Sequence, residues 1–214
     1  MRPATETIPK PMIPVCGKPF LQHQLQLLRR NGIDRALLLV SYLGEQIEQF
    51  FGSGDRLGMN VTYAYEPSPL GTGGALKNAL GRLEGEFVVL NGDTFLDIDY
   101  AAPVADFRRK KPSAMIVAGR GWVPVVNNLA VAEDGLVTSY RKRHPEGMTH
   151  TDAGAIILTR QVLDDIPAEK VCSLEEEIFP RLIQQGQMRA FVTSEPFFDM
   201  GSPEGLRALE QKLA

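Results

Sequence analysis

The sequence predicts an α/β domain of three layers, in which helices cover both sides of a mostly parallel sheet. Short apolar runs of strand length recur about every 25 residues in the first half, with helix-length segments between them, as in βαβ units with right-handed crossovers. With 214 residues, 43% of them hydrophobic and 23% charged, the chain can bury a core without a disulfide or metal.

Local patterns predict each element of the first half. Leu21, Leu25 and Leu28 lie at helical spacing and predict a helix over 18–31. The uninterrupted apolar run 36–40 predicts a strand buried on both faces. The other elements expected here are a helix over 44–51, a strand over 61–65, a helix over about 75–82, a strand over 87–90, a helix over 101–110 and a strand over 114–118.

The second half is less regular. Ser173-Leu174-Glu175-Glu176 has the form of a capping box and predicts a helix over 174–185. Ser202 and Pro203 suit the cap and the first position of a last helix. Short strands are expected over 129–132, 136–140, 154–159 and 189–193. The sequence contains no repeat or linker, so a single domain over 1–214 is predicted.

Composition excludes several classes of protein. Lys and Arg number 23 and Asp and Glu 26, a net charge of −3, which argues against binding nucleic acid by bulk charge. The basic runs Arg108-Arg109-Lys110-Lys111 and Arg141-Lys142-Arg143 are interpreted as solvated faces. Cys16 and Cys172 stand far apart and indicate reduced thiols of a cytoplasmic protein. Apolar runs are shorter than a membrane span requires, so no membrane partner is expected.

Asn91-Gly92-Asp93 directly follows the predicted strand 87–90. Ligands of open parallel sheets bind outside the carboxyl ends of the strands, and a carboxylate there suits Mg²⁺, which takes one or two carboxylates plus phosphate oxygens. The alternative is a hairpin turn, which is weakened because no alternating return strand follows.

Two further segments could contact a ligand. Leu70-Gly71-Thr72-Gly73-Gly74-Ala75 joins a strand to a helix, where free N–H groups bind anions or polar base edges. The segment is neither a dinucleotide fingerprint nor a P-loop, and a tight structural turn is the alternative. Lys10 stands between Pro9 and Pro11, which predicts an extended backbone with limited conformational freedom at this lysine. The alternative is a surface lysine in a proline-rich terminus.

These segments, with Asp199-Met200-Gly201-Ser202-Pro203-Glu204, resemble the sugar-1-phosphate nucleotidyltransferases over essentially the whole chain. Residues 5–19 resemble the family's lysine segment, 66–76 its base-binding loop, 89–93 its metal-binding turn and 199–204 its second metal ligand. Four motifs in order are more specific than any one of them. The run 70–77 resembles heptose- and mannose-1-phosphate guanylyltransferases.

The resemblance implies a Rossmann-like fold with a nucleotide-binding half over 1–120 and a sugar-binding half over 121–214. It also implies Mg²⁺-dependent transfer of a nucleotidyl group from a nucleoside triphosphate to a sugar 1-phosphate, with release of pyrophosphate, in the cytoplasm. By resemblance, Asp93 and Asp199 would hold Mg²⁺, while Lys10 and Lys142 would neutralise phosphate oxygens. The implied nucleotide contacts are Glu66, Leu70, Gly71, Thr72, Asn91 and Gly92, and the implied sugar contacts are Asn128, Asp152 and Gly154. The oligomeric state is left open.

The chain departs from the family pattern around the sugar. Arg141 replaces the glutamate that usually precedes the second lysine, Asp152 replaces the asparagine of the sugar contact, and Asn127-Asn128 replaces a Tyr-Gly pair. The identity of the sugar is therefore open. A surface lysine remains the alternative for Lys142, and a solvated turn residue for Asp152.

Glu66 favours GTP as the donor. Thymidylyl- and uridylyltransferases commonly carry Gln there, whereas a carboxylate can accept both the N1–H and the N2 amine of guanine. The alternative is that the loop's backbone reads the base and Glu66 faces solvent.

Two other functions remain as hypotheses. A regulatory paralogue that binds a nucleotide sugar without turnover would be expected to lose a metal carboxylate or the lysine, but Lys10, Asp93 and Asp199 are all present. A glycosyltransferase would use Asp97-Ile98-Asp99 as its metal motif, and the segments around Lys10 and 70–76 would then have no role.

Family members begin with a strand and a glycine-rich loop, whereas Met1-Arg2-Pro3-Ala4-Thr5 falls inside the segment that follows that loop. The sheet is thus expected to lack its first strand. This predicts an internal methionine taken as a start, or a truncated fragment of the active enzyme that is unstable or nearly inactive.

Overall fold

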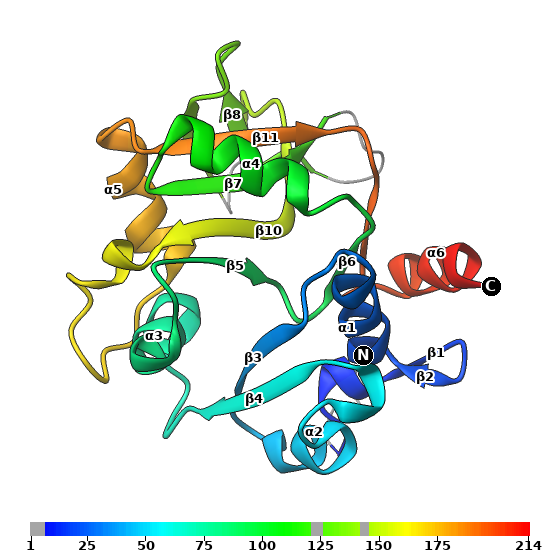
Figure 1. Cartoon of the computed structure of the whole chain (residues 1–214). Helices are drawn as coiled ribbons and strands as arrows, with labels where there is room; N and C mark the ends of the chain where they lie inside the picture. The colour runs from blue at the N-terminus through cyan, green and yellow to red at the C-terminus, as the bar shows by residue number, and fades with distance from the viewer. Residues whose placement is uncertain (1–6, 121–125, 142–145) are drawn as a thin grey trace. The chain divides into compact units, whose positions relative to one another are not determined.

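The computed structural model describes residues 7–120, 126–141 and 146–214, which group into two compact units (Figure 1). The first contains residues up to Ser68, Asn91–Asp97 and Phe197–Ala214, and the second contains Pro69–Leu90 and Ile98–Pro196. Two of the predicted features, the opening residues 1–5 and Lys142, lie outside the described residues.

The first unit is built on two parallel strands. β3 (Arg35–Val40) pairs with β4 (Asn60–Tyr65), with Arg35 opposite Asn60 and Val40 opposite Tyr65. Two short antiparallel pairs join them, β1 with β2 and β6 with β12. The bounds of the other elements are η2 (Lys10–Met12), β1 (Pro14–Val15), β2 (Lys18–Pro19), α1 (Phe20–Arg30), α2 (Gly44–Phe51), η3 (Asp55–Leu57), β6 (Thr94–Leu96), β12 (Phe197–Asp199) and α6 (Pro203–Leu213).

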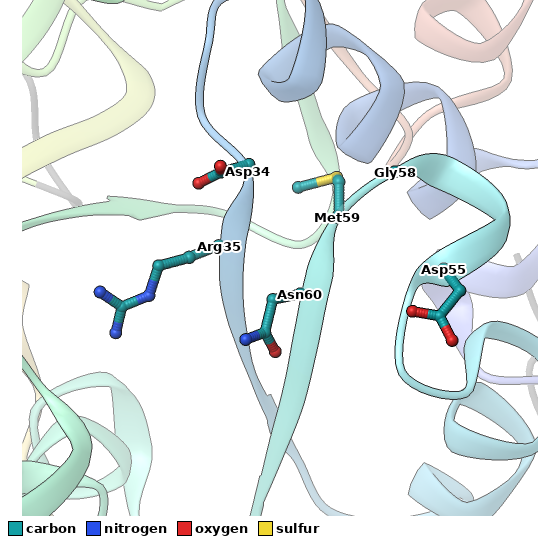
Figure 2. A pocket seen from close by; sticks show the side chains of 6 residues that line it. All are labelled: Asp34, Arg35, Asp55, Gly58, Met59 and Asn60. Carbon is teal, nitrogen blue, oxygen red and sulfur yellow. The ribbon is translucent and has the colours of Figure 1, made fainter.

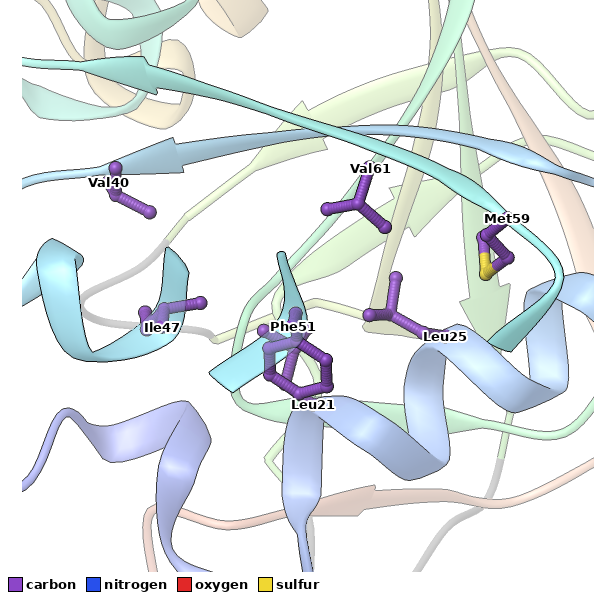
Figure 3. Close-up of a cluster of buried hydrophobic side chains, with 7 residues drawn as sticks. All are labelled: Leu21, Leu25, Val40, Ile47, Phe51, Met59 and Val61. Carbon is purple, nitrogen blue, oxygen red and sulfur yellow. The ribbon is translucent and has the colours of Figure 1, made fainter. Parts of the chain in front are cut away.

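The core of this unit lies between the two helices α1 and α2 and the strand pair. Figure 3 shows the buried side chains, which come from α1, α2, β3, β4 and the residue before β4: Leu21, Leu25, Val40, Ile47, Phe51, Met59 and Val61. The helical spacing of the leucines on α1 places them on one face. Burial of this face is what fixes α1 against the strands.

β3 is less buried than its apolar sequence predicts. Residues 36–39 are only partly buried and Val40 alone is fully buried. In the described part of the chain β3 is hydrogen-bonded to β4 only. The prediction of a strand buried on both faces was therefore wrong in this structure. An edge strand has a neighbouring strand on one side only, so its residues stay partly accessible to solvent on the other side.

The second unit contains a four-stranded sheet in the order β11-β7-β10-β5. β10 is antiparallel to both neighbours and β11 is parallel to β7, so three of the four strands run in one direction. On this sheet α4 packs Phe107 against Met115 and Ile157. The bounds are α3 (Gly71–Asn78), η4 (Leu80–Arg82), β5 (Glu86–Leu90), α4 (Ala101–Lys110), β7 (Ala114–Gly119), β8 (Leu129–Val131), β9 (Val137–Tyr140), β10 (Thr151–Thr159), η5 (Arg160–Leu163), η6 (Leu174–Ile178), α5 (Phe179–Gln184) and β11 (Met188–Thr193).

Most predicted elements are confirmed, with differences at the helix ends. The helix expected over 75–82 begins earlier, at Gly71, and its last turn is a separate 3₁₀ turn, η4. The predicted capping box is only half right. Ser173 Oγ accepts from the N–H of Glu176 as expected, but the carboxylate that accepts from the N–H of Ser173 belongs to Glu177. The helix opens with a wider π turn over Leu174–Ile178, which shifts the partner by one residue.

None of the helices described here combines the length and the apolar character needed to cross a membrane.

Candidate functional site

Asn91-Gly92-Asp93 connects the end of β5 to β6. β6 does not return along β5 but pairs with β12, with Thr94 opposite Asp199. The hairpin alternative for this turn is therefore excluded. The turn leaves Asn91 and Gly92 exposed and the Asp93 side chain 38% exposed, so the turn is open to a ligand.

Lys10 lies beside Asp93. Its Nζ donates to Asp93 Oδ2 over 2.6 Å, and the two side chains are 34% and 38% exposed. Lys10 begins a 3₁₀ turn, closed by Met12 N–H donating to Pro9 O over 2.8 Å. The extended conformation expected for Lys10 was wrong, because proline also fits the first turn of a helix, where no N–H is needed.

Asp199, the last residue of β12, is the second carboxylate of this region. Met200 N–H donates to Asp93 O over 2.9 Å, which joins the two aspartate-bearing segments through the backbone. Gly201 N–H donates to Asp199 Oδ1 over 2.7 Å. A Cβ atom at Gly205 would lie 1.9 Å from Asp199 O, so the first turn of α6 can approach β12 only with glycine there.

The donor set fits magnesium held jointly with phosphate. Among the described ranges, no group of three or more His, Cys, Asp or Glu side chains is placed to hold a metal ion by itself. Mg²⁺ typically takes one or two carboxylates and completes its six ligands with water and substrate phosphates. Asp93 and Asp199 supply such a pair, and Lys10 supplies a positive charge beside it.

Gly92 differs from most glycines of the chain because the fold does not require it. Its φ lies outside the left-handed region. An added Cβ would meet only Pro11 Cγ at 3.7 Å, an ordinary contact. Within the described residues the backbone and packing would thus accept alanine, so a ligand approaching the backbone is a reason for glycine there.

The glycine-rich loop at the start of α3 lies in the second unit, against residues 170–172. Gly73 and Gly74 N–H both donate to Cys172 O, and Cys172 N–H donates to Leu70 O. A Cβ at Gly71 would lie 2.7 Å from Cys172 O, and one at Gly74 would lie 2.5 Å from Lys170 O. The loop is thus also a tight structural turn, and its glycines permit the close approach of two backbones.

Only part of this loop is open to a ligand. The Leu70 side chain is 1% exposed, whereas Gly71 and Thr72 are exposed. The Thr72 hydroxyl donates to Glu175 Oε2 over 2.9 Å and accepts from Leu174 N–H over 2.8 Å. The exposed backbone of Gly71 and Thr72 therefore remains the surface that a base could contact.

Glu66 follows β4 in the first unit. Its N–H donates to Val40 O over 2.9 Å, which extends the ladder between β3 and β4 by one bond. The residue is partly buried and has at least one further interaction.

The predicted sugar contacts form a connected polar cluster in the second unit. Asn128 Oδ1 accepts from Asp152 N–H, and Asp152 Oδ1 accepts from Gly154 N–H, both over 2.8 Å. Asp152 belongs to β10 and is partly buried, so the alternative of a solvated turn residue was wrong.

Tyr140 joins this cluster and was not predicted. Its hydroxyl donates to Asp152 Oδ2 over 3.2 Å, and its ring packs edge-on against Phe179. Burial, followed by the negative charges of Asp152 and Glu175, raises the pKa of Tyr140 far above its usual value. The hydroxyl therefore stays protonated and remains a donor. The available signal was its place at the end of the predicted strand, directly before Arg141.

The carboxylates of the glycosyltransferase hypothesis have other partners. Asp97 Oδ2 lies 3.4 Å from Lys212 Nζ. Asp99 Oδ1 accepts from Ala101 N–H at the start of α4. Each aspartate therefore has a structural role.

A cavity of about 450 Å³ lies at the amino ends of β3 and β4, and none of the predicted site residues lines it (Figure 2). Its lining consists of Asp34, Arg35, Asp55, Gly58, Met59 and Asn60. Open α/β sheets bind ligands at the opposite, carboxyl ends of their strands. We therefore give it no part in the candidate site.

Three relatives resemble the chain in sequence. The mannose-1-phosphate guanylyltransferase of Mycobacterium tuberculosis is 34% identical over 95% of this chain and 58% of its own length. The UTP–glucose-1-phosphate uridylyltransferase of Synechocystis is 32% identical over 87% of this chain and 53% of its own length. The D-glycero-α-D-manno-heptose 1-phosphate guanylyltransferase of Campylobacter jejuni is 32% identical, over 92% and 87% respectively. The chain thus spans little more than half of the first two.

The fold is shared with HddC from Yersinia pseudotuberculosis. That crystal structure has a TM-score of 0.86 and 31% identity, over 97% of this chain and 91% of HddC. HddC has also been solved in complex with GMP-PN. The family model described as nucleotidyl transferase matches residues 1–214. From its motifs, its fold and these relatives, the chain is a member of the sugar-1-phosphate nucleotidyltransferase family.

Proposed function

We propose that this protein transfers a nucleotidyl group, with GTP as the preferred donor, to a sugar 1-phosphate in a Mg²⁺-dependent reaction. The observation that carries the proposal is the 2.6 Å pair between Lys10 and Asp93. Asp93 directly precedes β6, and the partner strand of β6, β12, ends at Asp199. The proposal includes a cytoplasmic location, because Cys16 and Cys172 are both unpaired thiols, as is usual in reducing compartments.

The residues act by positioning and neutralising anions. An oxygen of the sugar 1-phosphate attacks the α-phosphorus in line, the bond to the bridging oxygen breaks, and pyrophosphate leaves with that electron pair. Lys10 would neutralise phosphate oxygens beside Asp93, and Lys142 would be the second such cation. Asp93 and Asp199 would hold Mg²⁺, which when bound would lower the charge of the phosphate oxygens.

The proposed donor depends on Glu66 and on the loop that begins at Leu70. A carboxylate at position 66 would accept both donors of the guanine edge, while the backbone of Gly71, Thr72, Asn91 and Gly92 would contact the nucleotide. The names of two guanylyltransferase relatives and the GMP-PN complex of HddC support guanine. The uridylyltransferase relative makes UTP the competitor to test.

The proposed sugar contacts are Asn128, Asp152 and Gly154, with Tyr140 donating a hydrogen bond to Asp152. Asp152 is an acceptor where the family usually has an amide, so we expect it to favour a donating hydroxyl of the sugar. The heptose and mannose relatives make the corresponding 1-phosphates the first acceptors to assay.

The test is a panel of GTP, UTP, dTTP, CTP and ATP, each with several sugar 1-phosphates, assayed for pyrophosphate with and without Mg²⁺. Mg²⁺-dependent release with GTP and one sugar 1-phosphate is expected. Binding of a nucleotide sugar without any pyrophosphate release would instead identify a regulatory paralogue.

A further inference from the structure

Gln24 is a buried polar side chain of α1 that no part of the proposed reaction uses. It is 6% exposed, on a helix whose other buried residues are apolar. Its Nε2 donates to Asn91 O over 2.9 Å and to Thr94 O over 2.6 Å. A buried amide is costly unless it is hydrogen-bonded, and here both hydrogens of the nitrogen are used.

The two acceptors flank Gly92 and Asp93. A single nitrogen of α1 thus fixes the backbone on both sides of the segment that carries the candidate metal ligand. The orientation of the amide follows from its partners, because two carbonyl oxygens can face only the NH₂ end. Apolar side chains have no donor, and a lysine would place a charge at a 6% exposed position.

Besides the bonds from Gln24, the turn is held by the Lys10–Asp93 pair and by a few backbone bonds. Asn91 and Gly92 are exposed, so packing contributes little there. Outside the ladder of β6 with β12, the backbone bonds described for this segment are Thr94 N–H to Asn91 O, at a long 3.4 Å, and Met200 N–H to Asp93 O at 2.9 Å. The two bonds from Gln24 therefore hold the backbone on both sides of Asp93, together with the Met200 bond to Asp93 O.

We infer that Gln24 is a positioning residue: through the carbonyls of Asn91 and Thr94 it sets the place of Asp93 for metal binding. The inference rests on the proposed function for its consequence in the reaction. The positioning of the turn itself does not depend on that function. Loss of groups that orient a metal ligand typically costs about 10- to 100-fold in metal affinity or activity.

The test compares Gln24→Met, which keeps the length but removes both donors, with Gln26→Met as a matched control. Gln26 lies on the same helix and is partly exposed. Two quantities are measured on the full chain: amide hydrogen exchange of residues 91–94, and the Mg²⁺ concentration that gives half of the maximal pyrophosphate release. Gln24→Met is expected to speed the exchange and to raise the Mg²⁺ requirement at least about tenfold, while Gln26→Met changes neither.

The outcomes separate the inference from the proposed function. Wild-type exchange at 91–94 in folded Gln24→Met would overturn the positioning role. Faster exchange with an unchanged Mg²⁺ requirement would keep the turn's dependence on Gln24 but refute its link to the metal. If the wild-type chain releases no pyrophosphate, the proposed function fails while the exchange result still decides the positioning. If Gln24→Met does not fold, Gln24→Asn is used instead. Its side chain is one methylene shorter, so its amide no longer reaches the two carbonyls, and the same two measurements are made.

Discussion

In the turn 91–93 the glycine has room for a side chain, whereas in the loop 70–74 each glycine lies against another part of the chain. A Cβ at Gly92 would meet one atom at 3.7 Å, but a Cβ at Gly71, Gly73 or Gly74 would lie 2.5–3.1 Å from atoms of Lys170 or Cys172. Both segments were predicted as ligand loops because glycine lets a ligand approach. At Gly92 the fold gives no structural reason for glycine, so ligand approach is the reason that remains. At Gly71, Gly73 and Gly74 the close packing of the chain already requires glycine.

The same contrast holds for the polar groups. Around Asp93, the side chains of Lys10 and Asp93 stay one-third exposed and pair with each other. Around Asp152 and Thr72, the polar groups bond mainly to neighbouring chain segments. The first unit thus leaves the charged groups of Lys10 and Asp93 partly exposed, while the polar groups of the second unit are held in hydrogen bonds. We expect substitutions at Asp93 to change rate and those in the second unit to change stability or the KM for the sugar 1-phosphate.

The largest effect is expected from Asp93→Asn. Loss of this carboxylate should reduce kcat by about 10²–10³-fold, the usual cost of removing a charge-stabilising group at such a centre. The fold should persist, since the side chain is 38% exposed. Pyrophosphate release measures the rate, and Asp97→Asn, which removes a carboxylate paired with Lys212, is the control. Near-normal turnover in Asp93→Asn would contradict the metal assignment.

Gly92→Ala and Gly74→Ala compare the two loops directly. Gly92→Ala should change the free energy of unfolding by less than about 0.5 kcal/mol but lower kcat/KM for the nucleotide about 10- to 100-fold by misplacing it. Gly74→Ala should destabilise the fold by about 1–3 kcal/mol through overpacking, partly offset by alanine's helix propensity. Denaturant unfolding and steady-state kinetics measure both. A destabilised Gly92→Ala with normal kinetics would reverse the interpretation of the two glycines.

Glu66→Gln is expected to shift the choice of base. A glutamine offers a donor that guanine's N1–H and N2 amine repel, so the ratio of kcat/KM for GTP over UTP should fall about tenfold, the scale of one lost bidentate contact. Glu45→Gln, an exposed carboxylate of α2, should leave the ratio unchanged. The same preference in both variants would mean that Glu66 does not contact the base.

Tyr140→Phe should give the smallest effect. It removes the donor to Asp152 Oδ2, a change of about 1 kcal/mol. KM for the sugar 1-phosphate should therefore change about fivefold, while KM for the nucleotide stays constant. Tyr63→Phe is the matched control, because Tyr63 also donates its hydroxyl, to Gly52 O, in the other unit. Equal effects on both KM values would assign Tyr140 to stability alone.

The sequence predicted most of the elements for physical reasons, and the two candidate carboxylates were found from their places in those elements. Asp93 follows an apolar strand and Asp199 precedes a capped helix, so each lies at the end of a recognisable element. Gln24 and Tyr140 could not be predicted, since each depends on partners more than ten residues away. The pairing of β6 with β12 joins two three-residue strands, which are too short to show a period. The early start of α3 overrides the low helix propensity of three glycines through bonds to Cys172.

The distance of 1.9 Å between a Cβ atom built at Gly205 and Asp199 O limits which substitutions this position can accept in evolution. A side chain at position 205 would clash with the backbone carbonyl of Asp199. Even an alanine there would therefore displace a candidate metal ligand. Position 205 therefore requires glycine for a structural reason, although it need not touch a substrate. The sequence signature of this segment should accordingly extend past Glu204 to Gly205. A library of variants at each position would show this as a loss of function for substitutions at Gly205.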